Sequence, residues 1–476
     1  METRDYILLT INGQMHKIKG EHAFLPLSSL LRYELGLTGT KVVCAEGDCG
    51  ACTVLFRRHQ FSSERFQSLN SCISTSFLMD MNHIITVEGL ASQNHLSEIQ
   101  DSMIKNFGGQ CGFCTPGFVM SLTNLYENHK QATEQKVKNY LTGNLCRCTG
   151  YQPIINAALA VDTTKIKPLA RQYDYSRAEH DFDSEKQRPI KITLSEKEFF
   201  APTTLEMAAE YKSKNPEARI FSGATDIGVQ INKGKNPGNK LMSLHLIPSL
   251  YEIRQEGDFT VIGARVSLHA LQKYLERKQS QFADFLNIFA SPQIKNTATL
   301  VGNLANGSPI ADTTPFLLTV DAMVDMQGSL GKRSLLLTDF IKGYKSFDLK
   351  DDEFITSIRF KLPNPAKIKI GLFKVSQRRD LDISSVNSCF IFQTHNKKIE
   401  KAKIAYGGVG PKALRLFDVE KAIEGQELNT ALVDKIKQMI STRITPITDL
   451  RGSADFRSQQ CLDLFDRFVQ ENFTYE

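Results

Sequence analysis

The sequence lacks the features that would take it into a membrane, out of the cell or onto nucleic acid. It has no apolar run of about eighteen residues, the length that a transmembrane helix needs. Its N-terminus, METRDYILLT, is charged and soon continues into an expected strand, which is unlike a signal peptide. Its 58 basic residues are nearly matched by 52 acidic ones, so the net charge of +6 does not indicate nucleic-acid binding. These absences predict a cytoplasmic protein with neither a membrane nor a nucleic-acid partner.

Cysteine, by contrast, is concentrated in a few short segments. In the cytosol disulfides are rare, so clusters among the 10 cysteines more often hold metal. The segment VVCAEGDCGACTVL carries Cys44, Cys49 and Cys52, and Cys72 follows at a distance. This spacing, C-x4-C-x2-C with a distant fourth cysteine, is the plant-type pattern for a 2Fe–2S cluster. A structural zinc site and inert buried thiols are the alternatives.

The surroundings of these cysteines favour the iron–sulfur interpretation. Gly47 and Gly50 allow the tight bend that converging thiolates require, and they let backbone N–H groups point at sulfur. Upstream, YILLTINGQMHKI predicts a β-hairpin with Asn12 and Gly13 in a primed turn. PLSSLLRYELGLTG then predicts a helix that begins after a serine and ends at a glycine.

A second set of cysteines has a different spacing. GQCGFCTPGFVMSLTNLYEN supplies Cys111 and Cys114, and LTGNLCRCTGYQPIINAALAV supplies Cys146 and Cys148. A proline-started apolar helix is expected after each pair, so both pairs precede helix N-termini, which favour an anionic group. A C-x2-C pair alone is compatible with zinc or a redox dithiol. The C-x-C partner makes a zinc ribbon less favourable than a second two-iron cluster.

The remaining sequence is a mixture of helix and strand patterns. Residues 166–193 have little periodicity and many charges, which predicts a linker. TTLEMAAEYKSKNP predicts an amphipathic helix with a threonine start, and ARIFSGATDIGVQI predicts a strand that enters a glycine turn. Gly223 in that turn would allow close approach of an anion to the backbone, although the turn is not a Rossmann motif. A second polar turn, in LVGNLANGSPIADTT, could contact a ligand or could be an ordinary turn.

The two cysteine motifs together closely resemble the iron–sulfur half of the molybdenum hydroxylases. This family includes xanthine dehydrogenase, aldehyde oxidase, carbon monoxide dehydrogenase and quinoline-type oxidoreductases. The resemblance covers all eight cysteines of the two sets and implies that each set binds one 2Fe–2S cluster. It also implies a β-grasp ferredoxin-like domain over residues 1–87 and a helical-bundle 2Fe–2S domain over residues 88–165. Gln110 matches the family position that contacts molybdopterin, whereas its sequence context alone suggests a solvated loop residue.

The same resemblance extends to the C-terminal part of the chain and completes a multidomain α+β architecture. It implies an α+β FAD-binding domain of the vanillyl-alcohol-oxidase type over residues 194–365 and a C-terminal flavoprotein subdomain over residues 366–476. The first turn would surround the FAD pyrophosphate through Ile220, Phe221, Ser222, Gly223, Ala224, Thr225, Asp226 and Ile227. Further expected FAD contacts are Phe289, Thr299, Gly302, Asn303, Ser308, Asp312, Ile355 and Lys374.

Lys374 is the candidate catalytic residue. It lies in GLFKVSQRRDLDISSVN, which resembles the family's mobile loop beside the flavin ring. Known xanthine dehydrogenases usually have an aromatic pair before the position of Phe289, whereas this chain reads LNIFA and has no tryptophan. The resemblance therefore does not predict how the flavin face is gated.

Cys389 and Cys461 match no ligand position and are expected to be buried structural thiols.

Iron–sulfur clusters and flavin in one chain would convert between one-electron and two-electron chemistry. In the family, electrons pass from molybdenum through the two clusters to FAD. Because the sequence includes no molybdopterin domain, that centre is expected on a larger partner chain. The fused modules resemble the small subunit of bacterial xanthine dehydrogenase. This resemblance implies that the whole enzyme oxidises hypoxanthine and xanthine to urate, with NAD+ as the electron acceptor and oxygen as the alternative acceptor. It also implies a heterotetramer of two small and two large chains. The alternatives are another molybdenum hydroxylase, a stand-alone iron–sulfur flavoprotein reductase and a zinc-binding scaffold.

Overall fold

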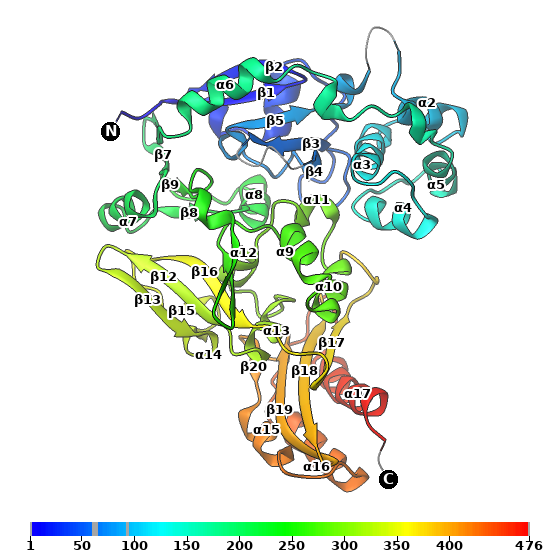
Figure 1. Cartoon of the computed structure of the whole chain (residues 1–476), viewed down its shortest axis with the longest axis vertical. Helices are drawn as coiled ribbons and strands as arrows, with labels where there is room; N and C mark the ends of the chain where they lie inside the picture. Colours follow the sequence, from blue (N-terminus) through cyan, green and yellow to red (C-terminus); the bar gives the residue numbers. More distant parts are fainter. Residues whose placement is uncertain (1, 60–64, 92–94, 475–476) are drawn as a thin grey trace. The chain divides into compact units, whose positions relative to one another are not determined.

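The structure is a computed structural model that describes residues 2–59, 65–91 and 95–474 (Figure 1). The chain folds into two compact units. The first comprises Met1–Pro248 and Ser291–Ala298, and the second comprises Ser249–Ala290 and Thr299–Glu476. The range expected for the FAD-binding domain therefore contributes to both units.

The first unit begins with a five-stranded sheet in the order β2-β1-β5-β3-β4. Its strands are β1 (Tyr6–Ile11), β2 (Gln14–Lys19), β3 (Thr53–Arg58), β4 (Gln67–Asn70) and β5 (Asn82–Ile85). β1 pairs parallel to β5, and the other neighbours pair antiparallel. The expected hairpin is confirmed, since Asn12 and Gly13 have φ angles of 50° and 81°, as a primed turn requires. The expected helix is also present, as α1 (Leu27–Ser29) and the π-helical turn η2 (Leu30–Glu34).

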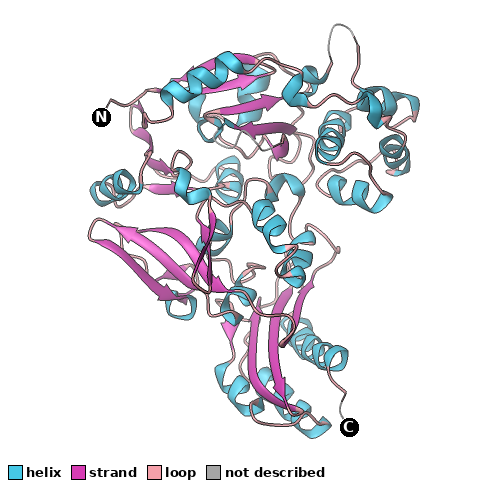
Figure 2. Cartoon of the chain, in the orientation of Figure 1, coloured by secondary structure: helices cyan, strands magenta, loops and turns pink. Residues whose placement is uncertain are grey.

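Four helices form a second part of this unit, drawn in cyan beside the first sheet in Figure 2. They are α2 (Glu98–Lys105), α3 (Thr115–Asn128), α4 (Glu134–Leu141) and α5 (Gln152–Leu159). Both α3 and α5 have a proline in the first turn, as expected from the sequence. Phe118 and Ile154 of these helices share one buried core with Leu55 and Ile85 of the first sheet. The two cysteine-bearing parts are therefore packed together rather than linked loosely.

The segment that the sequence predicts as a linker contains helix α6 (Ser176–Glu185), which the sequence analysis did not predict. The helix lies along the first sheet (Figure 1). Only Ala178 and Phe182 of α6 are buried, and Phe182 belongs to the core of that sheet. Two apolar residues one turn apart in a charged segment give too weak a periodicity to recognise.

The first unit also contains a second sheet, in the order β6-β7-β9-β8. Its elements are β6 (Ile190–Leu194), β7 (Lys197–Ala201), α7 (Leu205–Lys214), β8 (Arg219–Phe221), α8 (Thr225–Asn232), β9 (Lys240–Ser243) and α11 (Pro292–Lys295). Thr204 caps α7 as expected, because its side chain accepts from the Met207 N–H. β8 and β9 are parallel, and α8 leaves the end of β8 directly after the glycine turn.

The second unit contains two larger antiparallel sheets and a small one. The first has the order β10-β11-β16-β12-β13, formed by β10 (Ile253–Glu256), β11 (Phe259–Gly263), β12 (Met323–Gly328), β13 (Gly331–Leu336) and β16 (Phe354–Lys361). The second has the order β17-β18-β19-β20, formed by β17 (Ile368–Val375), β18 (Val386–His395), β19 (Lys398–Gly407) and β20 (Leu414–Arg415). The small sheet pairs β14 (Ile341–Gly343) with β15 (Ser346–Phe347).

The helices of the second unit fall into two groups. Those before β17 are α9 (Leu268–Leu275), α10 (Ser280–Asn287), α12 (Leu300–Ala305), α13 (Thr314–Thr319) and α14 (Leu337–Phe340). Those after β20 are α15 (Phe417–Ile423), α16 (Thr430–Ser441) and α17 (Ala454–Asn472). Cys389 and Cys461 are fully buried, as expected, and burial raises the pKa of each thiol to about 12. None of the helices in the described part of the chain is both long and apolar enough to cross a membrane.

Candidate functional site

The structure brings together the four thiols of the first cysteine set. Cys44 hydrogen-bonds to Cys49 and to Cys72, and these contacts lower the pKa of its thiol. Cys72 in turn hydrogen-bonds to Cys52 and lowers the pKa of that thiol. Cys52 and Cys72 are only 2% and 3% exposed, whereas Cys44 and Cys49 are half-buried. The set therefore lies at the edge of the core, with one pair of thiols enclosed.

The loop around this set bends as its glycines predict. Gly47 and Gly50 have φ angles of 82° and 67°, in the region that favours glycine. A Cβ atom on Gly50 would lie 2.2 Å from the Gly143 carbonyl oxygen, so a side chain cannot be accommodated without movement of the backbone. The Glu46 N–H donates to Cys44 Sγ at 3.4 Å, which is the expected orientation of backbone N–H toward sulfur.

The second cysteine set also converges, but it lies nearer the surface. Cys111 hydrogen-bonds to Cys148 and raises the pKa of that thiol, and both residues are exposed. Burial, followed by the contact with Cys146, raises the pKa of Cys114 to about 12. Thr149 donates its backbone N–H to Cys146 Sγ at 3.5 Å, and its hydroxyl lies 3.1 Å from the same sulfur. As predicted, Cys111 and Cys114 precede helix α3, and Cys146 and Cys148 precede helix α5.

Both sets have the donor chemistry of a two-iron cluster. Each offers four thiols: in the first set the contact between Cys44 and Cys72 joins the pairs Cys44–Cys49 and Cys52–Cys72, and in the second Cys111 meets Cys148 and Cys114 meets Cys146. A 2Fe–2S cluster takes four cysteine thiolates over two irons, so four converging thiols in each set fit it. The residues of the chain therefore fit two such clusters.

The two sets are in direct backbone contact. The Leu145 N–H, next to Cys146, donates to the Cys49 carbonyl oxygen at 3.0 Å. The Asn144 side chain donates to the Gly50 carbonyl oxygen at 3.2 Å. A Cβ atom on Gly117 would lie 2.2 Å from that same oxygen, so α3 approaches the first loop as closely as glycine allows. The two clusters would thus be held at a fixed separation.

A buried glutamine that sequence reasoning missed joins this contact. Gln293 is 1% exposed, and its amide nitrogen lies 3.0 Å from Asn144 Oδ1, 3.2 Å from Ser121 Oγ and 3.3 Å from Thr53 Oγ1. It connects α11 to the parts of the chain that carry both cysteine sets. One polar residue among several in SPQIKN gives no signal of this role in the sequence.

Gln110, the expected molybdopterin contact, lies in an exposed bend directly before Cys111. Gln110 therefore lies at the surface on the loop that carries Cys111 and Cys114 of the second set.

The segment expected around the FAD pyrophosphate lies in the first unit. It runs from the end of β8 through Ser222 and Gly223 into the first turn of α8. Ala224 has a φ angle of 55°, and a Cβ atom on Gly223 would lie 2.1 Å from the Thr297 carbonyl oxygen. The turn is therefore held in one conformation, with the free N–H groups of a helix N-terminus beside it. Such groups favour a bound phosphate.

The other expected FAD contacts lie in the second unit, where Asp312 and Lys374 form a buried ion pair. Lys374 Nζ lies 2.6 Å from Asp312 Oδ2, and the two side chains are 2% and 7% exposed. Ser384 and Asn387 donate to the other oxygen of Asp312 at 2.5 and 2.8 Å. Lys374 belongs to β17, so the expectation of a mobile loop at this residue is wrong. Pairing in the sheet with Asn387 of β18 fixes its backbone.

The remaining expected contacts have local structural partners. Thr299 caps α12 by accepting from the Gly302 N–H at 2.9 Å, and Asn303 accepts from the Thr313 hydroxyl at 2.6 Å. Ser308 Oγ accepts from the Ile310 N–H at 3.4 Å. Ile355 is buried in β16, and the ring centre of Phe289 lies 6.0 Å from Lys374 Nζ. Phe289 and Asp312 are thus both next to Lys374, whereas the roles of the others toward FAD stay predictions.

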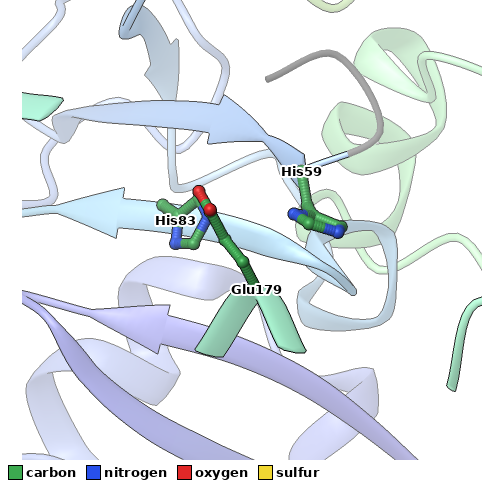
Figure 3. A group of neighbouring side chains, drawn as sticks. All are labelled: His59, His83 and Glu179. Carbon is green, nitrogen blue, oxygen red and sulfur yellow. The ribbon is translucent and has the colours of Figure 1, made fainter. Parts of the chain in front are cut away.

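A polar group that the sequence analysis did not identify holds α6 on the first sheet. Potential ligand atoms of His59, His83 and Glu179 lie within 4.8 Å of one another (Figure 3). Glu179 is already paired with the Arg57 guanidinium at 3.0 Å, and the positive charge of Arg57 disfavours a metal ion beside it. Burial, with smaller effects of Arg57 and His59, lowers the pKa of His83 to about 3. We therefore interpret the group as a partly buried polar contact between the sheet and the helix.

Comparison with domain families assigns three consecutive parts of the chain. Residues 86–159 match a [2Fe-2S] binding domain, and residues 193–365 match the FAD binding domain in molybdopterin dehydrogenase. Residues 371–472 match the CO dehydrogenase flavoprotein C-terminal domain.

Comparison with whole proteins gives relatives of two kinds. Xanthine dehydrogenase from Oryza sativa subsp. japonica is 30% identical over 96% of this chain and 39% of its own length. Aldehyde oxidase 2 from Rattus norvegicus is 28% identical over 99% of this chain and 39% of its own length. The chain spans roughly two fifths of the length of these relatives.

Two solved structures resemble part of the chain. Carbon monoxide dehydrogenase from Oligotropha carboxidovorans has a chain that is 25% identical, with a TM-score of 0.54, over 59% of this chain and 98% of that one. A chain of quinoline 2-oxidoreductase from Pseudomonas putida 86 is 22% identical, with a TM-score of 0.52, over 57% of this chain and 94% of that one, which shows the fold alone.

Proposed function

Because this chain is the iron–sulfur and FAD-binding part of a molybdenum hydroxylase, we propose that it transfers electrons for a xanthine dehydrogenase. It would accept electrons from a molybdopterin centre on a partner chain and deliver them to NAD+. The observation that carries the proposal is the convergence of eight thiols into two four-thiol sets in a chain that also has an FAD-binding domain. Clusters supply one-electron transfer and flavin supplies both one- and two-electron transfer.

The exposed second cysteine set supports docking of a partner at that face. Cys111 and Cys148 are exposed, as is Gln110. Phe107 and Phe113, which flank Gln110 in the sequence, are 81% and 49% exposed. Large exposed apolar side chains beside a redox centre are typical of a protein interface. The partner we propose is the molybdopterin-binding large subunit, in a heterotetramer of two small and two large chains.

The substrate of the whole enzyme is the finer part of the proposal. Oxidation of hypoxanthine and xanthine rests on the similarity to xanthine dehydrogenases at about 30% identity. The match of residues 371–472 to the CO dehydrogenase flavoprotein C-terminal domain, with the similarity to aldehyde oxidase 2, supports an alternative, in which the equivalent subunit serves an enzyme for carbon monoxide, an aldehyde or an N-heterocycle. Because the substrate would bind at the molybdenum centre, the partner chain decides between these possibilities.

Purification of the chain alone and with its partner tests the proposal. The isolated chain should contain about four irons, from two clusters of two, together with one FAD, and it should pass electrons from NADH to a dye. It should not hydroxylate xanthine, whereas the complex with the molybdenum-containing chain should do so. A colourless chain containing zinc would contradict the redox role. Hydroxylase activity of the isolated chain would contradict the two-subunit arrangement, and activity of the complex only on carbon monoxide, aldehydes or quinoline would favour the alternative.

At the flavin end, we propose that Lys374 and Asp312 act as a pair that contacts the flavin ring. Replacing the lysine removes a cation that would stabilise anionic reduced flavin, so Lys374→Met should lower the flavin potential and slow transfer from NADH to the dye. Lys369→Met is the matched control, because Lys369 is an exposed lysine on the same strand. If both variants keep FAD, both clusters and the wild-type flavin potential, Lys374 has only a structural role.

A further inference from the structure

Helix α8 links the expected FAD loop to the first cysteine set. Its first turn includes Thr225, Asp226 and Ile227 of that loop, and its last residue is Asn232. The opposite end of the helix contacts both cysteine-bearing segments of the first set. The family resemblance implies that the N-terminal turn of α8 contacts FAD, whereas no role was expected for its C-terminal end at Asn232.

Asn232 makes the central contact. Its side-chain amide donates to the Ala45 carbonyl oxygen at 2.8 Å and to the Cys72 carbonyl oxygen at 2.9 Å. Ala45 follows Cys44, so one amide group holds the two segments that supply separate thiols. Lys233 adds an ion pair with Glu46 at 3.0 Å.

The peptide group between Ala45 and Glu46 joins Asn232 to a sulfur atom. Its carbonyl oxygen accepts from Asn232, and its N–H donates to Cys44 Sγ at 3.4 Å. A hydrogen bond to the carbonyl polarises the peptide and strengthens the hydrogen bond made by the N–H. Hydrogen bonds to cluster sulfurs are one of the factors that set the reduction potential.

Helix α8 also packs closely against the segment that carries Cys72. A Cβ atom on Gly228 would lie 2.0 Å from the Ile73 carbonyl oxygen, so the helix contacts the backbone beside Cys72 directly. Val229 of α8 and Ile294 of α11 pack against the cluster formed by Cys52, Cys72 and Ile73. The thiols on this side are therefore covered by residues from the FAD-binding part of the sequence.

We infer that Asn232 is a positioning residue that sets the reduction potential of the first cluster through the Ala45–Glu46 peptide. The inference rests on the proposed function in that the first cysteine set must hold a cluster. Because N–H···S bonds stabilise the more negative, reduced form, loss of Asn232 should lower the potential of this cluster. The second cluster should keep its reduction potential, because the hydrogen bonds of Asn232 go only to the segments of the first set.

Redox titration of the holo chain, followed by electron paramagnetic resonance, tests this inference. Asn232→Ala removes the donor, and Asn232→Asp keeps the size of the side chain but cannot donate to a carbonyl. Both should lower the midpoint potential of the first cluster, and Asp should lower it further because of its negative charge. Asn236→Ala is the matched control, because Asn236 is an exposed asparagine whose side chain bonds only locally, to the Gly238 N–H.

The outcomes separate this inference from the proposed function. If the wild-type chain shows no signal from the first cluster, the proposed function is wrong and the inference about Asn232 is wrong with it. If all three variants contain both clusters with wild-type potentials, the inference is wrong while the proposed function stands. Selective loss of the first signal in the Asn232 variants would support the positioning role, since it would show that the two cysteine segments had separated.

Discussion

The two cysteine sets each offer four thiols, but their surroundings are opposite. The first includes two thiols that are almost fully buried and is covered by Val229 and Ile294, whereas the second includes two exposed thiols, Cys111 and Cys148. Solvent exposure and hydrogen bonding are the main influences of a protein on the potential of a cluster. Two clusters held by four cysteines each can therefore differ in reduction potential. In this chain the first, more enclosed set lies toward the expected FAD loop.

The largest expected effect comes from removing a ligand of each set in turn. Cys148→Ser and Cys72→Ser should each lose one cluster, about half of the iron, because a hydroxyl is a harder and less acidic ligand than a thiol. Cys72→Ser should also destabilise the first sheet, since Cys72 is buried, whereas Cys148→Ser should affect mainly the starts of α3 and α5. Iron analysis and electron paramagnetic resonance measure both losses. Retention of both clusters in either variant would refute that ligand assignment.

A chelator should distinguish the two sets in the unmodified chain. The exposed thiols of the second set give a chelator access to iron, so this cluster should disappear several-fold faster than the first. The measurement is the decay of each resonance signal after addition of an iron chelator. Binding of the partner should slow the loss from the second set only, if the proposed interface is correct. Equal rates of loss would show that exposure does not distinguish the clusters.

Mild acid should weaken the part that carries the first set. The pKa of His83 falls from about 6.5 when unfolded to about 3 when folded, so the unfolded state binds more protons between these values. Stability is therefore lost as the pH falls below about 6.5, by about 2 kcal/mol between pH 7 and pH 5. Hydrogen exchange in β5 and α6 measures the local effect, with α3 as the internal reference.

His83→Asn separates this contribution from other effects of acid. The variant should be less stable than wild type at pH 7, but its loss of stability on acidification should be smaller. Arg57, His59, Glu179 and Asp183 lie around this position and remain in the variant, so the difference in pH dependence between the two proteins reports the proton uptake of His83. The same pH dependence in both proteins would exclude His83 as the cause.

The smallest change in stability is expected from a substitution at the exposed face beside the second cysteine set. Phe113 is 49% exposed, so Phe113→Ser should change the stability of the isolated chain by less than about 0.5 kcal/mol. It should nevertheless weaken binding of the molybdenum-containing partner, measured by calorimetry. Leu330→Ser is the control, because Leu330 is 94% exposed in the β12–β13 turn of the second unit. Equal partner affinity in both variants would place the interface elsewhere.

The sequence by itself determined which cysteines form the two sets and the local geometry around them. Cysteine spacing, Gly47, Gly50 and the prolines at the starts of α3 and α5 act within a few residues, so their consequences could be predicted without the fold. Only the tertiary structure decided which distant segments support them. Asn232 bonds Cys72 across 160 positions, Gln293 bonds Asn144 across 149, and Lys374 pairs with Asp312 across 62. Single polar residues at such separations have no periodicity, and packing of the surrounding sheets and helices determines which of them meet.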